Sequence, residues 1–190
     1  MSTASTIAYL ATSVDSLIAG PDDDLAWLAE ERSSGRPIAA AAWARRADGG
    51  LGSDELLGRL GCMLMGRCTY DAVIAMGAPW PYRDLPVRVA TTQPLSVENP
   101  AITPVEGRID SLVEDALAAV AGKEVYVDGG RMVRTTLAAG LLDVLVVTML
   151  PVVLGEGTPL FDATVPRTDL TVVDVAKYGD GLVQIHYRCR

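Results

Sequence analysis

The stretch from Lys123 to Phe161, KEVYVDGGRMVRTTLAAGLLDVLVVTMLPVVLGEGTPLF, decides the fold of this chain. Its first apolar run, 125–127, predicts a strand that ends at Asp128-Gly129-Gly130. The next apolar side chains fall on one face of a helix, which Gly140 would end as a C-cap. The run 144–153 is apolar except for Thr148 and predicts a strand buried on both faces. This order is a βαβ unit, and its glycine turn places a helix N-terminus where a phosphate can bind.

Strand and helix patterns alternate along the rest of the chain. Strands are predicted at 7–14, 62–65 and 87–90, and helices at 25–31, 38–46, 53–60, 71–76 and 109–121. Ser111 and Glu114 have the spacing of a capping box in the last of these helices. The alternating runs 170–178 and 182–187 flank Gly179-Asp180-Gly181, which is typical of a hairpin. We expect a single α/β domain, 1–190, with three layers, in which helices flank a mostly parallel central sheet that ends in a C-terminal antiparallel hairpin.

Composition narrows the class of function. The net charge of −8 argues against a general nucleic-acid surface and against binding to an anionic membrane. The apolar run 144–154 is about half of the ~20 residues that a membrane-spanning helix needs. Residues 1–6 lack the cationic flank of a signal peptide. We therefore expect a cytoplasmic protein with neither nucleic-acid nor membrane partners.

The sequence offers few metal ligands and few nucleophiles. Its cysteines have no metal-binding spacing, and their odd, sparse count favours reduced thiols over a disulfide framework. The single histidine, His186, lies in a predicted strand. These observations predict no metal site and leave little scope for Ser-His-Asp chemistry.

Three turns follow predicted strands and carry glycine, cationic or hydroxyl residues: Gly66-Arg67-Cys68-Thr69, Thr91-Thr92-Gln93 and Gly129-Gly130-Arg131. In an open α/β sheet, ligands bind beyond the carboxyl ends of the strands, so the turns can converge on one extended ligand that bears phosphates. Each turn alone is as compatible with a purely structural role. The chain contains neither the GxGxxG fingerprint nor a Walker loop.

The order of several motifs resembles that of the dihydrofolate reductase-like superfamily. The motifs are SVDSLIAGPDDDLAWL (13–28), LMGRCTYDAV (64–73) with the downstream WPY (80–82), VYVDGGRMV (125–133) and AGLLDVLVVTMLPVVLGEGTPLF (139–161). The similar branch is the C-terminal reductase domain of the bifunctional riboflavin-biosynthesis deaminase/reductase. The resemblance implies an NADPH-dependent reductase that transfers a hydride to a small heterocyclic or carbonyl substrate, with 5-amino-6-(5-phosphoribosylamino)uracil as one candidate.

The resemblance also implies which residues bind NADPH. The first turn would hold the cofactor phosphates, the second would contact the adenosine 2′-phosphate, and the third would bring backbone amides to the pyrophosphate. Apolar residues near the N-terminus would wall the nicotinamide. Relatives usually carry an arginine in the second turn; its absence leaves the choice between NADPH and NADH open, with Arg67 or Arg88 as other sources of charge. The implied cofactor-binding residues are Ala11, Ile18, Ala19, Gly66, Arg67, Thr69, Thr91, Thr92, Gly129, Gly130, Arg131 and Met132.

Three carboxylates are candidates for catalysis. Asp24 resembles the acid that folate reductases carry on their first helix, although a role as helix cap explains it better. Asp15 either orders a turn or touches the substrate. Asp128 occupies the place where riboflavin-pathway reductases carry Glu before Gly-Gly, and it either bonds the substrate or braces the turn. Aromatic side chains are candidates for lining a flat heteroaromatic pocket, or are ordinary core: Trp27, Trp43, Trp80 and Tyr82.

Two other functions stay open from the sequence. One is a dihydrofolate reductase, and the other is a non-catalytic nucleotide-binding or structural dimer protein, which the altered second turn and the uncertain acid favour. The resemblance also implies a homodimer, with 144–150 and 182–187 as candidate interface strands.

Overall fold

The computed structural model describes residues 4–29, 50–77, 79–95, 99–178 and 181–190. The helices there are the 3-10 helix η1 (Pro21–Asp23), α1 (Ala26–Ala29), α3 (Ser53–Arg59), α4 (Arg67–Ala75), α5 (Ile109–Ala119) and α6 (Gly130–Ala138). The strands there are β1 (Thr6–Thr12), β2 (Leu17–Ala19), β3 (Leu60–Gly66), β4 (Val87–Ala90), β5 (Ile102–Val105), β6 (Glu124–Asp128), β7 (Val144–Met149), β8 (Thr158–Pro159), β9 (Thr171–Lys177) and β10 (Val183–Arg188).

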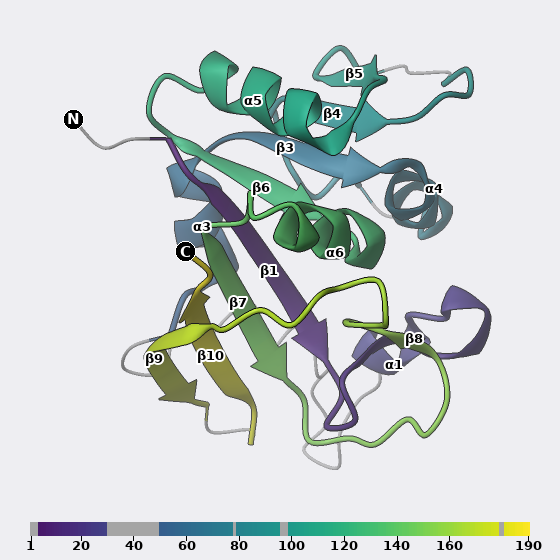
Figure 1. Ribbon diagram of the computed structural model, residues 1–190. Helices are drawn as coiled ribbons and strands as arrows, with labels where there is room; N and C mark the ends of the chain where they lie inside the picture. The colour runs from purple at the N-terminus through teal and green to yellow at the C-terminus, as the bar shows by residue number, and fades with distance from the viewer. Residues whose placement is uncertain (1–3, 30–49, 78, 96–98, 179–180) are drawn as a thin grey trace.

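The described strands form one large sheet and one small ribbon (Figure 1). The sheet has the order β5-β4-β3-β6-β1-β7-β10-β9. Its strands from β5 to β7 run parallel, whereas β10 runs antiparallel to both of its neighbours, β7 and β9. The ribbon pairs β2 with β8. The predicted α/β class, with its mostly parallel sheet and C-terminal antiparallel hairpin, is confirmed.

Helices cover both faces of the sheet, and the alternation along β3 shows why. Cys62 and Leu64 pack on α5, while Met63 and Met65 pack on the other face with residues of α3 and α4. In Figure 1, α5 and α6 lie on the near face and α3 lies behind the sheet. Successive side chains of a strand point to opposite faces of the sheet. Because helices cover both faces, both sets of side chains are buried, which explains the continuous apolar runs of the central strands.

The structure corrects several predicted boundaries. Helix α4 begins at Arg67 rather than at Asp71, because Gly66 is itself extended and serves as the N-cap. Strand β7 ends at Met149, two residues before Pro151, which has no N–H to donate to a ladder. The predicted capping box is wrong, since the N-cap of α5 is Arg108. The predicted helix 38–46 lies outside the described residues.

Two short elements were not predicted from the sequence. Strand β5 contains Pro104, which normally argues against a strand, but β5 is the edge strand of the sheet, where proline is tolerated. The ribbon of β2 and β8 joins segments too short to show a period of two. Across the ranges that the structure describes, no helix is long and apolar enough to cross a membrane.

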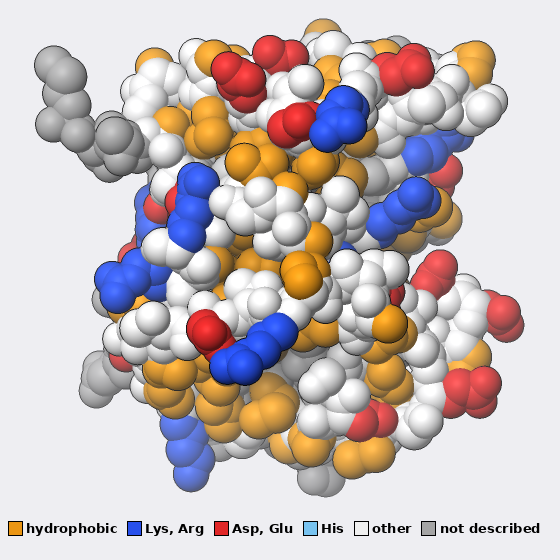
Figure 2. Space-filling model, viewed as in Figure 1, with side chains coloured by type: hydrophobic (Ala, Val, Ile, Leu, Met, Phe, Trp, Pro, Cys, Tyr) orange, Lys and Arg blue, Asp and Glu red, His pale blue; other side chains and the backbone are white. Residues whose placement is uncertain are grey.

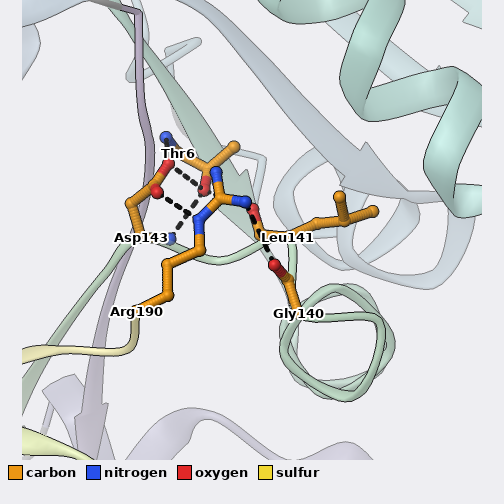
Figure 3. Close-up of polar contacts among 5 residues, drawn as sticks. All are labelled: Thr6, Gly140, Leu141, Asp143 and Arg190. Carbon is orange, nitrogen blue, oxygen red and sulfur yellow. Dashed lines mark hydrogen bonds and ion pairs between the residues drawn. The ribbon is translucent and has the colours of Figure 1, made fainter.

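The amino ends of β1 and β7 are closed by a polar cluster (Figure 3). Asp143 Oδ2 accepts hydrogen bonds from the Thr6 amide at 2.8 Å and from the Thr6 hydroxyl at 3.1 Å. The Thr6 hydroxyl donates to Leu141 O at 2.6 Å, and Arg190 pairs with Asp143 and donates to Gly140 O at 3.1 Å. The cluster links Arg190 to the first strand. The polar groups at this end of β1 and β7 therefore have hydrogen-bond partners within the chain.

Candidate active site

A groove of about 680 Å³ lies at the carboxyl ends of β3, β4 and β5. Its walls come from four segments far apart in the sequence: the start of α4, the loop after β4, the turn between β5 and α5, and the start of α6. The structure therefore brings the three predicted turns together. The predicted cofactor residues that line the groove are Gly66, Arg67, Thr69, Thr91, Thr92, Arg131 and Met132.

The starts of three helices face this groove without side-chain caps. The N-cap residues are Gly66 for α4, Arg108 for α5 and Gly129 for α6, and none of them has a side-chain cap hydrogen bond. The first amide groups of a helix have no intrahelical partner, and they carry the positive end of the helix dipole. At α5, the Ser111 amide already donates to Asp110 Oδ1 at 3.0 Å. The starts of α4 and α6 have no acidic residue in their first turns, so they form the more favourable site for a ligand with phosphates.

The Gly129-Gly130 turn requires glycine at both positions. Gly129 has a φ of +91°, and a Cβ there would lie 2.1 Å from Thr69 Oγ1. A Cβ on Gly130 would lie 2.3 Å from Ile18 Cδ1. The turn is thus pressed between Thr69 of α4 and Ile18 of β2, and this contact joins the groove to the β2 ribbon.

The arginines that line the groove differ in whether a carboxylate neutralises their charge. Arg67 Nε lies 2.8 Å from the Asp71 carboxylate, and Arg67 also donates to Pro94 O at 3.1 Å. Arg108 pairs with Asp110 at 3.2 Å. Arg131 has no ion pair within the described ranges, so its exposed guanidinium at the start of α6 is available to an anion. Arg88 does not line the groove.

The residues predicted to wall the nicotinamide lie apart from the phosphate groove. Ala11 packs in a cluster with Trp27 and Leu150, and Ala19 is buried in β2 against β8. Ile18 alone of the three contacts the glycine turn directly. Their common location is the carboxyl end of β1 and the ribbon that follows it, beside the Gly129-Gly130 turn.

Asp128 ends β6 immediately before this turn, and its carboxyl group is partly buried. Oδ1 accepts a hydrogen bond from the Gly129 amide at 2.8 Å and lies 3.3 Å from the Tyr126 hydroxyl. Oδ2 lies 3.2 Å from the Tyr82 hydroxyl. Burial raises the pKa of Asp128, because a carboxylate loses its hydration there, and hydrogen bonds to the carboxyl only partly offset this cost. A carboxyl group with a raised pKa is suited to hold a proton for transfer.

The other two candidate acids have structural partners. Asp15 accepts hydrogen bonds from the amides of Leu154 at 3.1 Å and Gly155 at 2.7 Å. Hydrogen bonds from Ser13 and from these amides lower the pKa of Asp15 to about 2, so it is an anion at neutral pH and a poor proton donor. Asp24 is exposed and accepts a hydrogen bond from the Ala26 amide at 2.9 Å at the start of α1, which is the capping geometry.

Aromatic side chains form a row that leads to Asp128. The rings of Tyr70 and Trp80 are 6.2 Å apart, and those of Trp80 and Tyr82 are 5.1 Å apart in an edge-to-face arrangement. Trp80 Nε1 is buried without a hydrogen-bond partner. Trp27 packs elsewhere, in the cluster with Leu150, and Trp43 lies outside the described residues.

Sequence reasoning missed the fourth segment of the groove. Glu106, Gly107 and Arg108 line it, together with Ile109 and Leu112 of α5. Helix α5 was predicted, but the preceding strand was hidden by Pro104, so the turn between them was not recognised as a strand-to-helix turn. The combination of an extended Ile102-Thr103 pair and Gly107-Arg108 before a strong helix was the available signal.

Metal chemistry has no structural support among the residues described. No group of three or more His, Cys, Asp or Glu side chains there is placed to hold a metal ion. Cys62, Cys68 and Cys189 are free thiols. His186 lies on β10 with Nε2 2.8 Å from Gln184 Oε1, and burial lowers the pKa of its imidazole. It lies in a polar network within the sheet's core rather than at the groove.

Comparison with known proteins agrees with this architecture. Residues 4–184 match the family described as the RibD C-terminal domain. The chain belongs to this family. It is 27% identical over 183 residues to the uncharacterized protein YwjB of Bacillus subtilis strain 168, and the match covers 96% of each chain. The fold of the family is dihydrofolate reductase-like, as the order of the motifs implied.

Solved structures share the fold of this chain. A putative riboflavin biosynthesis protein from Shewanella sp. PV-4 is 28% identical, with a TM-score of 0.79, over 98% of this chain and 99% of that one. A diaminohydroxyphosphoribosylaminopyrimidine deaminase/5-amino-6-(5-phosphoribosylamino)uracil reductase from Thermotoga maritima is 14% identical. Its TM-score is 0.64, over 99% of this chain and 57% of that one, and at this identity the likeness shows the fold alone.

Proposed function

We propose that this chain is an NADPH-dependent reductase that transfers a hydride to a small heterocyclic or carbonyl substrate. The observation that carries the proposal is the convergence of three helix starts without side-chain caps on one groove, whose wall residue Thr69 packs against the Gly129 turn next to Asp128. Membership of the RibD C-terminal domain family supports a reductase-like role. Phosphate sites beside a protonatable carboxyl group fit a dinucleotide cofactor and a reaction that consumes a proton.

The chain's own residues fit the cofactor at both ends. The amides at the starts of α4 and α6 would bind the pyrophosphate, and Arg131 would neutralise part of its charge. Thr91 and Thr92 would contact the adenosine ribose and its 2′-phosphate, while Ile18 would shield the nicotinamide end from water. When bound, the nicotinamide supplies the hydride. Asp128 would supply the proton and would then remain as a carboxylate held by the Gly129 amide and the Tyr82 hydroxyl.

The substrate that best fits this region is a flat, polar heterocycle such as 5-amino-6-(5-phosphoribosylamino)uracil. Trp80 and Tyr82 form an aromatic row beside Asp128, and aromatic rings favour flat partners. The reductase from Thermotoga maritima is described as acting on this uracil, which makes it the first compound to try. A dihydrofolate reductase finds less support, because Asp24, the acid it would use, is exposed and caps α1.

A binding experiment tests the first step. Arg131→Gln removes the unpaired cation of the groove, and we expect it to weaken NADPH binding about tenfold or more, as measured by isothermal titration calorimetry. Arg167→Gln is the matched control, because Arg167 is an exposed arginine paired with Asp169 and does not line the groove. An unchanged affinity in Arg131→Gln, or no heat of NADPH binding by the wild type, would refute the cofactor site.

A turnover experiment tests the second step. Oxidation of NADPH is followed at its absorbance maximum with the uracil above, with dihydrofolate and with a panel of small carbonyl compounds. Reduction of the uracil supports the proposal, and reduction of dihydrofolate would favour a folate reductase. Binding of NADPH without reduction of any compound would favour a nucleotide-binding protein without turnover.

We also expect a homodimer, with the second copy at the edge strand β9. Three valines of β9 are exposed, Val172 at 55%, Val173 at 63% and Val175 at 56%. Figure 2 shows hydrophobic side chains gathered where β9 and β10 lie in Figure 1. Strands β7 and β10, the two strands expected at the interface, each have both edges paired within the sheet. Val173→Lys should therefore shift sedimentation toward the monomer, and an unchanged sedimentation coefficient would exclude this edge.

A further inference from the structure

The protonation state of Asp128 can be deduced from the hydrogen atoms available around it. The Tyr126 hydroxyl lies 2.7 Å from the carbonyl oxygen of Tyr9. A carbonyl oxygen only accepts, and a phenol has a single proton, so the proton of Tyr126 points to Tyr9. At the 3.3 Å contact between Tyr126 and Asp128 Oδ1, the Tyr126 oxygen therefore presents a lone pair.

Only one protonation state of Asp128 satisfies this arrangement. If Asp128 is ionised, two electron-rich oxygens face each other at 3.3 Å in a buried place. If Asp128 is a carboxylic acid with its proton on Oδ1, that proton completes a hydrogen bond to Tyr126. The hydroxyl oxygen of the acid still accepts from the Gly129 amide, and the carbonyl oxygen Oδ2 accepts from the Tyr82 hydroxyl.

We propose that Tyr126 is a positioning residue, whose oxygen accepts a hydrogen bond from protonated Asp128 and so keeps the proton on Oδ1. Tyr82 has the opposite role, because its hydroxyl donates to Oδ2 and stabilises the carboxylate once the proton has left. The inference deepens the proposed function and rests on it for its catalytic meaning. In the reaction, a hydride adds to the electrophilic carbon of the substrate and the proton of Asp128 passes to the neighbouring heteroatom. Asp128 is left ionised and regains a proton from solvent.

The groups that face Asp128 are few, which makes the test clean. Tyr126 belongs to β6 and Tyr82 to the loop before β4, and burial raises the pKa of both phenols. No ion pair of the described residues includes Asp128. The charge state of Asp128 thus depends on burial, one amide and two phenols.

The experiment is a pH titration of the Asp128 side-chain carbon by NMR, with 13C-labelled aspartate in the protein without cofactor and with Asp128→Asn to assign the signal. We expect a midpoint above the ~3.9 of a free aspartate in the wild type. Tyr126→Phe removes an acceptor for the acid and should lower the midpoint by about one unit. Tyr82→Phe removes a donor to the carboxylate and should raise the midpoint by about one unit.

Opposite shifts in the two variants support the inference. If Tyr126 instead donates to Asp128, Tyr126→Phe will raise the midpoint as Tyr82→Phe does, and the inference is overturned. A wild-type midpoint at or below that of free aspartate would also overturn it, even if neither variant folds. Because no cofactor or substrate is present, these outcomes are independent of whether the chain reduces anything. Failure of the proposed function would appear only in the binding and turnover experiments.

Discussion

The two ends of the parallel sheet hold two aspartates whose pKa values shift in opposite directions. At the amino end, burial alone would raise the pKa of Asp143, but the hydrogen bonds from Arg190 and Thr6 prevail and lower it. At the carboxyl end, burial prevails and raises the pKa of Asp128. The first carboxylate meets a cation, an amide and a hydroxyl that all donate to it, whereas the second faces no cation.

The difference separates the part of the molecule that holds the fold from the part that is open to a ligand. Around Asp143, donors and acceptors pair within the chain, so the end is complete without a ligand. Around the groove, three helix starts lack side-chain caps, and Arg131 is left without an ion pair among the described residues. Unpaired donors are a cost for an isolated domain and an advantage only where an anion binds.

The largest expected effect is on turnover, and it comes from removing the carboxyl proton of Asp128 at the carboxyl end of the sheet. Asp128→Asn keeps an acceptor for the Gly129 amide but cannot give up a proton, so turnover of the proposed pyrimidine substrate should fall about 10²–10⁴-fold. The Kd of NADPH should stay within about twofold, because Asp128 does not line the phosphate groove. Steady-state and single-turnover kinetics measure the first quantity and calorimetry the second. Full activity in this variant would remove Asp128 from the mechanism.

The next effect tests the glycine turn that joins the groove to Asp128. Gly129→Ala would place a Cβ 2.1 Å from Thr69 Oγ1 at a φ of +91°. We expect a loss of about 2–3 kcal/mol in the free energy of unfolding, and weaker NADPH binding as α6 shifts. Gly140→Ala is the matched control, because Gly140 also has a positive φ, +68°, but nothing lies within 4 Å of its Cβ position. It should cost about 1 kcal/mol and leave binding unchanged.

The sequence predicted the fold, and the three turns that meet at the groove, because both depend on local patterns. Apolar runs predicted β1, β3, β4, β6 and α5, and glycine between a strand and a helix marked the start of α6, whereas α4 was predicted to begin at Asp71 instead of Arg67. What escaped prediction depends on tertiary contacts. Pro104 is acceptable only because β5 is an edge strand, and β2 is a strand only because β8 pairs with it.

The roles of the candidate catalytic aspartates also depend on tertiary contacts that the sequence does not reveal. In the sequence, Asp24 was better explained as a helix cap, whereas Asp15 and Asp128 could each either order a turn or touch the substrate. Their roles separate only through partners distant in the chain: Leu154 and Gly155 for Asp15, and Tyr82 for Asp128. The nearby cap of Asp24 was the one role that local sequence could predict.

Substitutions at the amino end of the sheet, around Asp143, should lower the free energy of unfolding and leave NADPH binding unchanged. Asp143→Asn replaces a carboxylate that accepts from Thr6 and pairs with Arg190, and we expect the free energy of unfolding to fall by about 2 kcal/mol. Arg190→Gln should cost less, about 0.5–1 kcal/mol, because the arginine side chain is about half exposed. Urea denaturation measures both, and neither variant should alter the Kd of NADPH. A change in that Kd would show that the two ends are coupled.

The smallest effect is a pH dependence of opposite sign at the two ends. The pKa of Asp143 is lowered on folding, so its contribution to stability is present above the unfolded value of ~3.9 and is lost as pH falls through the folded value. The pKa of Asp128 is raised on folding, so stability is lost as pH rises from ~3.9 through its folded value. Asp128→Asn should therefore gain stability relative to the wild type as pH rises from ~3.9 towards 7, and should lose this advantage near pH 3. Urea denaturation of both proteins across this range measures the difference, and Asp143→Asn should show the reverse trend, with its deficit largest at pH 7. A constant difference between Asp128→Asn and the wild type would mean that Asp128 ionises alike in the folded and unfolded chains, and the contrast between the two ends would then not lie in their charge states.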